Sequence, residues 1–235
     1  MLLNFHIMLR NIFTLVIILA STLAFAQDFE GTFKEGNNYI IFENNIVKFN
    51  MDDGMNLLSN IVGEGTYTYT DNYLLVNTTD YSGIKTEAEI LSNAKKDTLT
   101  ISVINQDNFY EKGVLVELLN EKNKVLVGGV TNDAGIAIFK TNPKVKKVRV
   151  FNMGHDDIIF DYDPTNDYRI KLAKNEVVEN QVVAFSVKKI DDDTLSVIML
   201  TTKFDAGKEP QKELDKLSKK TQKRKLIEKR MKRMF

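Results

Sequence analysis

Short alternations of apolar and polar residues fill the N-terminal part of the chain, and tight turns interrupt them. Residues 39–42 and 46–49 are separated by a polar triplet, a spacing that suits a hairpin. Two further runs flank Asp71-Asn72, a dipeptide that tolerates left-handed backbone geometry. Tyr, Thr, Ile and Val dominate these runs and fit a pleated, half-buried surface. The pattern therefore predicts a β-meander over residues 27–84.

A more regular series of apolar runs follows in the middle of the chain, punctuated by Gly, Asn, Asp and Pro. The seven runs are residues 98–103, 114–119, 125–130, 136–140, 147–151, 157–160 and 168–172. Seven short strands at this spacing predict a β-sandwich, which we assign to residues 97–175. Residues 81–96 are polar and poorly periodic, so we expect a linker with room for one helical turn. The expected fold class is mainly β.

The turn Thr131-Asn132-Asp133-Ala134-Gly135 joins two of these runs and is either a binding site or a corner of the sandwich. Asn and Asp side chains bond to their own backbone in such turns, and Gly135 supplies a positive φ without a Cβ penalty. We interpret the turn as a structural corner.

Residues 113–118, 129–139 and 148–155 together resemble the carboxypeptidase regulatory-like domain, a transthyretin-like sandwich. In that family a Thr-Asp-x-x-Gly turn joins two strands, and a later strand ends in Gly-Tyr. This chain has Asn132 in place of the Asp and His155 in place of the aromatic residue. The resemblance covers residues 98–172. It implies a transthyretin-like seven-strand sandwich that serves as an interaction or spacing module.

The meander resembles the opening strands of lipocalin-like barrels over residues 29–80. About eight strands are needed to close a barrel, and the meander alone supplies too few. Two later apolar runs, residues 182–189 and 194–204, have no other predicted partner. We therefore hypothesise that residues 180–205 return to the meander and complete its barrel, which makes the sandwich an insertion. Binding of a small apolar ligand by such a barrel is our alternative hypothesis for the function.

The first 26 residues have the composition of an export signal. Arg10 precedes a short apolar run, and Ala24-Phe25-Ala26 forms a small-x-small cleavage box. An uncleaved membrane anchor needs about 18 or more apolar residues, so residues 1–26 are predicted to be a cleaved signal peptide. The chain has no cysteine, and an exported protein without disulfides fits a bacterial envelope. We expect it in the periplasm rather than outside the cell.

The formal net charge of the chain is zero, but the charges are unevenly distributed. Residues 208–235 hold twelve Lys or Arg and four Asp or Glu, whereas residues 27–207 hold nineteen and twenty-eight. Pro210 suits the first turn of a helix. The apolar residues after it fall mostly along one helical stripe: Leu214, Leu217, Ile227, Met231 and Met234. Residues 208–235 are therefore predicted to form a basic amphipathic helix.

The cations of this segment are candidate contacts for an anionic surface: Lys219, Lys220, Lys223, Arg224, Lys225, Lys229, Arg230, Lys232 and Arg233. Each basic residue near an anionic membrane contributes about 1 kcal/mol. The expected partner is an anionic membrane surface or an envelope protein, and the alternative is a helix that docks on the acidic body of the same chain. Nucleic acid is not expected, because only Phe235 could stack on a base.

The mature chain offers few groups for catalysis. His155 is its only histidine, so a His-rich metal cluster cannot form, and no nucleophile-elbow sequence accompanies it. Acidic residues gather at 156–157, 161–167 and 191–193, but the calcium-loop pattern is missing and turns favour Asp and Asn anyway. We predict no catalytic residue, no metal and no cofactor, and hence a non-enzymatic interaction or structural protein. An enzyme would need a cleft that gathers His155 with acidic residues.

Overall fold

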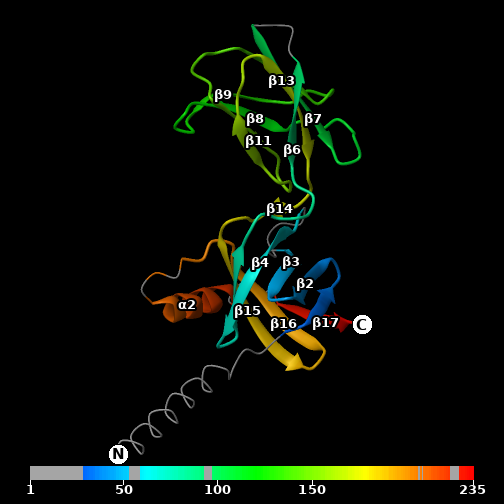
Figure 1. Cartoon of the computed structure of the whole chain (residues 1–235), viewed down its shortest axis with the longest axis vertical. Helices are drawn as coiled ribbons and strands as arrows, with labels where there is room; N and C mark the ends of the chain where they lie inside the picture. The colour runs from blue at the N-terminus through cyan, green and yellow to red at the C-terminus, as the bar shows by residue number, and fades with distance from the viewer. Residues whose placement is uncertain (1–28, 53–58, 93–96, 206, 208, 223–227) are drawn as a thin grey trace, which may run out of the picture.

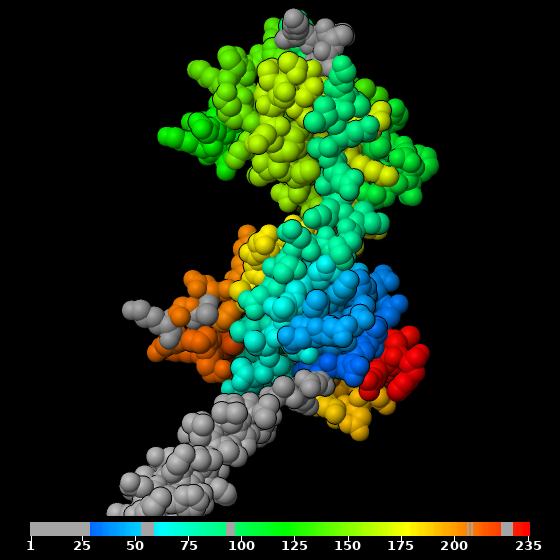
Figure 2. All heavy atoms as spheres, in the orientation of Figure 1, coloured from blue at the N-terminus to red at the C-terminus, as the bar shows by residue number. Residues whose placement is uncertain are grey.

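The computed structural model describes residues 29–52, 59–92, 97–205, 207, 209–222 and 228–235. Those residues form seventeen strands and one helix, so the protein is mainly β, as the sequence predicts. Two bodies follow one another along the long axis in Figure 1, and segments from both ends of the described chain build the lower one. A narrow waist joins the two bodies in the space-filling view (Figure 2). The predicted signal peptide, residues 1–26, lies outside the described residues.

Eight strands close the lower body into a barrel, in the order β4-β3-β2-β1-β17-β16-β15-β5, with β5 pairing back to β4. Their bounds are β1 (Gly31–Glu35), β2 (Asn38–Glu43), β3 (Ile46–Met51), β4 (Ile61–Thr70), β5 (Tyr73–Thr78), β15 (Val182–Asp191), β16 (Thr194–Thr201) and β17 (Lys229–Met234). The hairpin of β15 and β16 pairs with β5 on one side and with β17 on the other. The sandwich is therefore inserted between two parts of the barrel sequence.

Tight turns fix the register of the meander. Asn44 and Asn45 between β2 and β3, and Asp71 and Asn72 between β4 and β5, all have positive φ. That geometry matches the right-handed twist of the strands that each turn joins. Asn and Asp tolerate it because their short polar side chains bond locally to the backbone.

The barrel interior is filled by its own side chains. Every barrel strand contributes buried apolar residues to one cluster, with Phe33, Phe42, Phe49, Phe185 and Met231 among its members. The rings of Phe49 and Phe185 meet edge to face with their centroids 5.2 Å apart. Aromatic pairs in this arrangement add about 0.5–1.5 kcal/mol to the stabilisation that burial gives. The interior therefore works as a packed core, as in other small eight-stranded barrels.

Two four-stranded sheets form the upper body and share one core. The first sheet is β10 (Ile136–Lys140), β7 (Thr98–Asn105), β13 (Asn166–Leu172) and β6 (Glu87–Ser92), and the second is β12 (Ile158–Asp161), β11 (Lys147–Phe151), β8 (Leu115–Leu119) and β9 (Val125–Val130). Ile101 and Ile170 of the first sheet and Val116 and Val148 of the second are fully buried in the same cluster. Alternation of apolar residues along most of these strands directs one face inward, whereas β9 has no buried residue.

All seven predicted strands of this body are present, but the prediction of a linker over residues 81–96 was wrong for residues 87–92. Residues 87–92 form β6, which pairs antiparallel with β13. β6 is an edge strand and most of its residues are exposed, so its polar composition reflects its position in the sheet. Glu89 pairs with Arg169 of β13 at 3.2 Å. Residues 93–96 lie outside the described residues.

The prediction of one helix over residues 208–235 was also wrong. Only α2 (Pro210–Gln222) is helical, and residues 229–234 form β17 between β1 and β16. Met231 is buried in the barrel core while its neighbours Arg230 and Lys232 are exposed, the alternation of a strand. Backbone pairing on both edges and burial of Met231 outweigh the helical spacing of the apolar residues. Among the described residues, no helix has the length and apolar character to cross a membrane.

Candidate functional site

The edge of the sandwich at β9 is the most exposed apolar strand surface of the upper body. β9 pairs with β8 on one side only. Val125, Leu126, Val127 and Val130 are all exposed, and the strand contains no charged residue. Natural edge strands are usually blunted by charges, proline or a covering element, because their free backbone groups pair readily with other chains. This edge is left without such residues.

An open groove of about 590 Å³ lies between β9 and the neighbouring edge strand β10. Its walls come from Val127 to Gly129 on one side and from the segment that begins with Ile138 and Phe139 on the other. Ile138 is also exposed, so apolar side chains extend from one sheet edge to the next. The groove therefore offers apolar side chains beside an unpaired stretch of backbone.

The turn at residues 131–135 sets the geometry of this edge. The side-chain oxygen of Asn132 accepts hydrogen bonds from the amides of Ala134 and Ile136, each at 3.0 Å. Gly135 has a φ of +67°, and a Cβ there would lie 2.6 Å from the carbonyl oxygen of Val103. The Thr131 hydroxyl donates to the carbonyl of Glu111 at 2.6 Å. The turn thus acts as a corner that leads the chain from β9 to β10.

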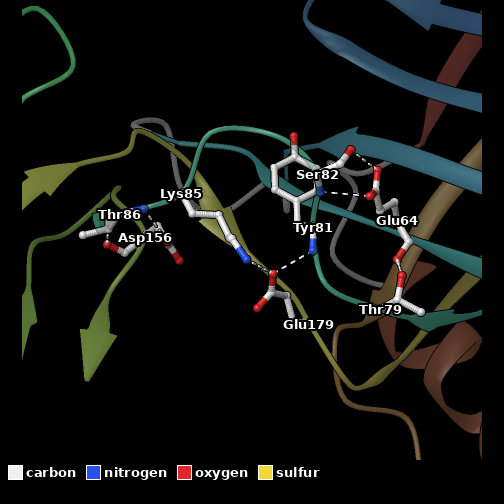
Figure 3. A network of polar contacts seen from close by, with 8 residues as sticks. All are labelled: Glu64, Thr79, Tyr81, Ser82, Lys85, Thr86, Asp156 and Glu179. Atoms are coloured by element: carbon white, nitrogen blue, oxygen red, sulfur yellow. Dashed lines mark hydrogen bonds and ion pairs between the residues drawn. The ribbon is translucent and has the colours of Figure 1, made fainter. Parts of the chain in front are cut away.

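Two linkers, residues 79–86 and 173–181, join the sandwich to the barrel, and polar side chains clamp them together (Figure 3). The carboxylate of Glu179 accepts hydrogen bonds from the amide of Tyr81 at 2.7 Å and from the Lys85 ammonium at 2.8 Å. Within the second linker, β14 (Glu176–Val177) adds a short parallel pairing to β4. These contacts limit how freely the sandwich can move relative to the barrel.

The other two carboxylates of Figure 3 hold the first linker at its two ends. Glu64 of β4 accepts hydrogen bonds from the amide and the hydroxyl of Ser82, at 2.8 and 2.9 Å. Asp156 of the sandwich accepts one from the amide of Thr86 at 2.9 Å. The Thr86 hydroxyl donates to the Asp156 carbonyl and accepts from the amide of Ala173 on the second linker.

The pKa values of these carboxyl groups shift in two directions. Burial alone would raise the pKa of Glu179, but hydrogen bonds from Lys85 and Tyr81 outweigh it and hold that pKa below the ordinary value. Burial and hydrogen bonding oppose each other in the same way at Glu64, where Ser82 and Lys48 lower the pKa. Burial raises the pKa of Asp156, and the hydrogen bond from Thr86 does not fully offset it. The surroundings of Glu64 and Glu179 therefore favour the ionised carboxylate, whereas the surroundings of Asp156 favour the protonated form.

A second cleft, of about 490 Å³, contains His155 at the end of the sandwich next to the linkers. Asp107 and Glu111 line the same cleft, so the structure brings the histidine and acidic residues together. Nδ1 of His155 lies 3.2 Å from the carbonyl oxygen of Met153 and 3.3 Å from the side-chain amide of Asn152. Among the described residues that line this cleft, none is a Ser or a Thr. Within the described parts of the chain, no group of three or more His, Cys, Asp or Glu residues could hold a metal ion.

The predicted anionic-surface residues divide between two elements. Lys219 and Lys220 lie in the last turn of α2, and Lys229, Arg230, Lys232 and Arg233 lie in β17. Lys223, Arg224 and Lys225 lie outside the described residues. In Figure 1, α2 and β17 are on opposite sides of the barrel. The cations therefore do not form one helical stripe, although an anionic contact by either group stays a prediction.

Part of α2 docks on the barrel wall. Leu214 is buried in a small cluster with Tyr73, Ala184 and Phe204. The Tyr73 hydroxyl donates to the Asp215 carboxylate at 2.9 Å. Residues 210–222 therefore dock on the body of the same chain mainly through apolar contacts, and the exposed cations at the end of α2 face solvent rather than acidic residues of the barrel.

Sequence reasoning found the strand at residues 125–130 but missed that it is an exposed edge. The available signal was a run without any charge that contains two adjacent glycines, Gly128 and Gly129. It also missed the clamp, because Glu179 and its partners are separated by 94 and 98 residues along the chain. No local pattern marks contacts over such a separation.

The fold and the site define a class, namely a two-body β protein with a filled barrel and an open-edged sandwich. No family model matches this chain, and no curated protein matches it either. Among solved structures, it aligns with a crystal structure of native alpha-2-macroglobulin from Escherichia coli spanning domains MG0-NIE-MG1, at 14% identity and a TM-score of 0.30. The alignment covers 59% of this chain and 63% of that chain, which is less than two thirds of its length. A similarity with so low a TM-score supports no conclusion about fold or function.

Proposed function

We propose that this protein is an exported, non-enzymatic interaction protein of the bacterial cell envelope. A lipocalin-like barrel forms its structural body, and a carboxypeptidase regulatory-like sandwich forms its binding module. The open apolar edge of β9 is the observation that carries this proposal. An exposed edge of this kind is a recurrent docking surface for an extended chain, because the backbone supplies affinity and the neighbouring side chains supply specificity.

The linker clamp supports the same function. A binding module presented at a distance from its body benefits from a fixed orientation, because less freedom is lost when the partner binds. Glu179 restrains both linkers through Tyr81 and Lys85. The barrel then serves as a rigid platform and leaves the far part of the sandwich uncovered (Figure 2).

The alternative, a barrel that binds a small apolar ligand, has less support. Ligand pockets are concave spaces that bury most of the ligand surface. The barrel interior instead holds its own packed cluster, in which Phe49, Phe185 and Ile40 are essentially inaccessible to solvent. A ligand there would have to displace close-packed side chains, which costs stability.

The proposal is tested by site-specific photocrosslinking in the full mature chain, residues 27–235. A photoreactive side chain replaces Leu126 at the β9 edge or, as the matched control, Ile46 on the barrel. Both side chains are apolar, lie on strands and are exposed. Incubation with solubilised envelope proteins of the source cells should give a discrete adduct from position 126 and none from position 46. Equal adducts at both positions, or none at either, would contradict the proposal.

The anionic-surface contact is tested separately by co-sedimentation with anionic liposomes at low and high salt. Pelleting that high salt releases would support it, because screening weakens surface charge contacts. Charge-reversing variants of Lys219 and Lys220 on α2, or of Arg230 and Lys232 on β17, then show which element makes the contact. Absence of pelleting at low salt would remove the membrane from the proposed partners.

A further inference from the structure

The β9 edge carries a glycine that its own fold does not explain. A Cβ on Gly128 would have its nearest heavy atom 3.6 Å away, at Cγ of Glu117, which is ordinary contact. Gly128 also does not have a positive φ, so its backbone conformation does not require glycine. By contrast, a Cβ on Gly129 would lie 3.2 Å from the ring of Phe139, so packing accounts for that glycine. Glycine inside a strand weakens it and often marks the close approach of another backbone.

The backbone polar groups of Gly128 point away from β8. The Thr131 amide donates to the carbonyl of Val114, and the Thr131 carbonyl accepts from the amide of Gly113, so both groups of Thr131 face the β8 side. Backbone groups alternate along a strand of an antiparallel pair, so Gly129 also faces β8 while Gly128 and Val130 face outward. Each outward residue offers one donor and one acceptor to a further strand.

Charges flank the strand in a self-complementary order. Lys122 and Lys124 precede β9 in an exposed turn whose shape is fixed by Asn120, which accepts hydrogen bonds from both lysine amides. Asp133 follows β9 with its side chain 95% exposed, 3.4 Å from the ammonium of Lys112, whose side chain is 75% exposed. An antiparallel second β9 would bring Lys122 and Lys124 of one copy toward Asp133 of the other, and Glu121 in the same turn leaves that end with two cations against one anion, a net charge of +1. The apolar centre carries no charge that would oppose the pairing.

We propose that β9 pairs antiparallel with β9 of a second copy of this chain, centred on Gly128, to join two four-stranded sheets across a two-fold axis. The two-fold arrangement places the same exposed apolar residues of each copy against one another, as an isologous interface requires. It also gives the outward groups of Gly128 and Val130 strand partners. The inference rests on the proposed function, because it names the occupant of the same sheet edge.

Sedimentation equilibrium of the mature chain, residues 27–235, tests this pairing over a range of protein concentrations. The wild type should populate a dimer. Gly128→Pro removes an amide that faces outward rather than toward β8, and it should weaken the dimer about tenfold or more because the donor is lost in both copies. Gly128→Ala keeps the amide but adds a methyl group where the second backbone approaches, so it should weaken the dimer less than Gly128→Pro does. Val130→Lys adds a charge to the edge without touching the backbone and should also weaken the dimer.

Ile159→Lys on β12 is the matched control, because it adds the same charge at an exposed apolar position on the opposite edge of the same sheet. It should leave the dimer unchanged, and circular dichroism checks that each variant is folded. A monomer at every concentration, or a dimer that Gly128→Pro and Val130→Lys leave as tight as the wild type, would overturn the inference. Those outcomes leave the proposed function standing if position 126 still crosslinks to another envelope protein, so the two can fail separately.

Discussion

The barrel and the sandwich differ in whether their sheets have free edges. Each of the eight barrel strands has a neighbour on both sides, so the barrel has no free edge. The sandwich has four strands with one neighbour each, namely β6, β9, β10 and β12. Closure is the one arrangement that removes edges altogether, whereas a sandwich must protect them or use them. The difference leaves the sandwich with the free strand edges that the proposed function uses for binding.

Separate cores should make the two bodies unfold separately. Phe49→Ala removes a ring that is 1% exposed from the barrel core, and it should lower the free energy of unfolding of the barrel by about 3–5 kcal/mol. Ile101→Ala should destabilise the sandwich by about 2–5 kcal/mol. Differential scanning calorimetry of the full chain should show each substitution moving one of two transitions. A single transition that both substitutions lower equally would show that the two bodies unfold as one.

The C-terminal strand is the element that closes the barrel, and Met231 is its buried residue. Met231→Ala should destabilise the barrel by about 2–5 kcal/mol, because it leaves a cavity in a close-packed core. Met234→Ala is the matched control, since Met234 lies on the same strand but is exposed, and it should change stability by no more than about 0.5 kcal/mol. Urea denaturation measures both. Similar small effects would mean that residues 229–234 do not contribute to the core.

Most of the strands could be predicted from the sequence, because alternation and turn residues are local signals. The Asp71-Asn72 turn and the strand at 136–140 follow from a few neighbouring residues. β17 could not be predicted in this way. Its backbone pairs with β1, nearly two hundred residues earlier in the chain, and only Met231 among its six residues is buried. A helical stripe was then the stronger local signal.

The candidate site shows the same limit in a different form. Gly128-Gly129 and the uncharged run around them are visible in the sequence, but a central strand can also lack charges. Whether β9 is central or at an edge depends on sheet order, which the local pattern does not contain. The linker clamp depends on sheet order too, because Glu179 lies two residues after β14, which pairs with β4, the strand that carries Glu64.

The clamp between the bodies should depend on pH. The pKa of Glu179 is lowered in the fold from an ordinary value of 4.5, so its contacts stabilise the protein fully above that value and are lost as the pH falls through the folded pKa. Glu179→Gln should cost about 1–2 kcal/mol at pH 7 and progressively less below pH 4.5. Asp156 acts in the opposite sense, because its raised pKa means that protonation relieves a penalty as the pH falls.

Urea denaturation at a series of pH values measures the difference between wild type and Glu179→Gln. Glu89→Gln on β6 is the control, because Glu89 forms an exposed pair with Arg169 and its loss should cost at most about 0.5 kcal/mol. A Glu179→Gln effect that stays constant from pH 7 to below pH 4.5 would show that ionisation of this carboxyl group does not hold the linkers.

The smallest expected effect separates what the sandwich edge needs for folding from what it keeps for binding. Gly128→Ala should stabilise the monomeric sandwich by about 0.5–1 kcal/mol, because the added methyl group meets no close contact and the unfolded chain loses freedom. Gly129→Ala should bring no such gain, because its methyl group would press on the ring of Phe139. Thermal denaturation at a concentration where the protein is monomeric compares the two variants. If Gly128→Ala destabilises the monomer, the fold itself requires this glycine, and its presence ceases to indicate a second backbone at the β9 edge.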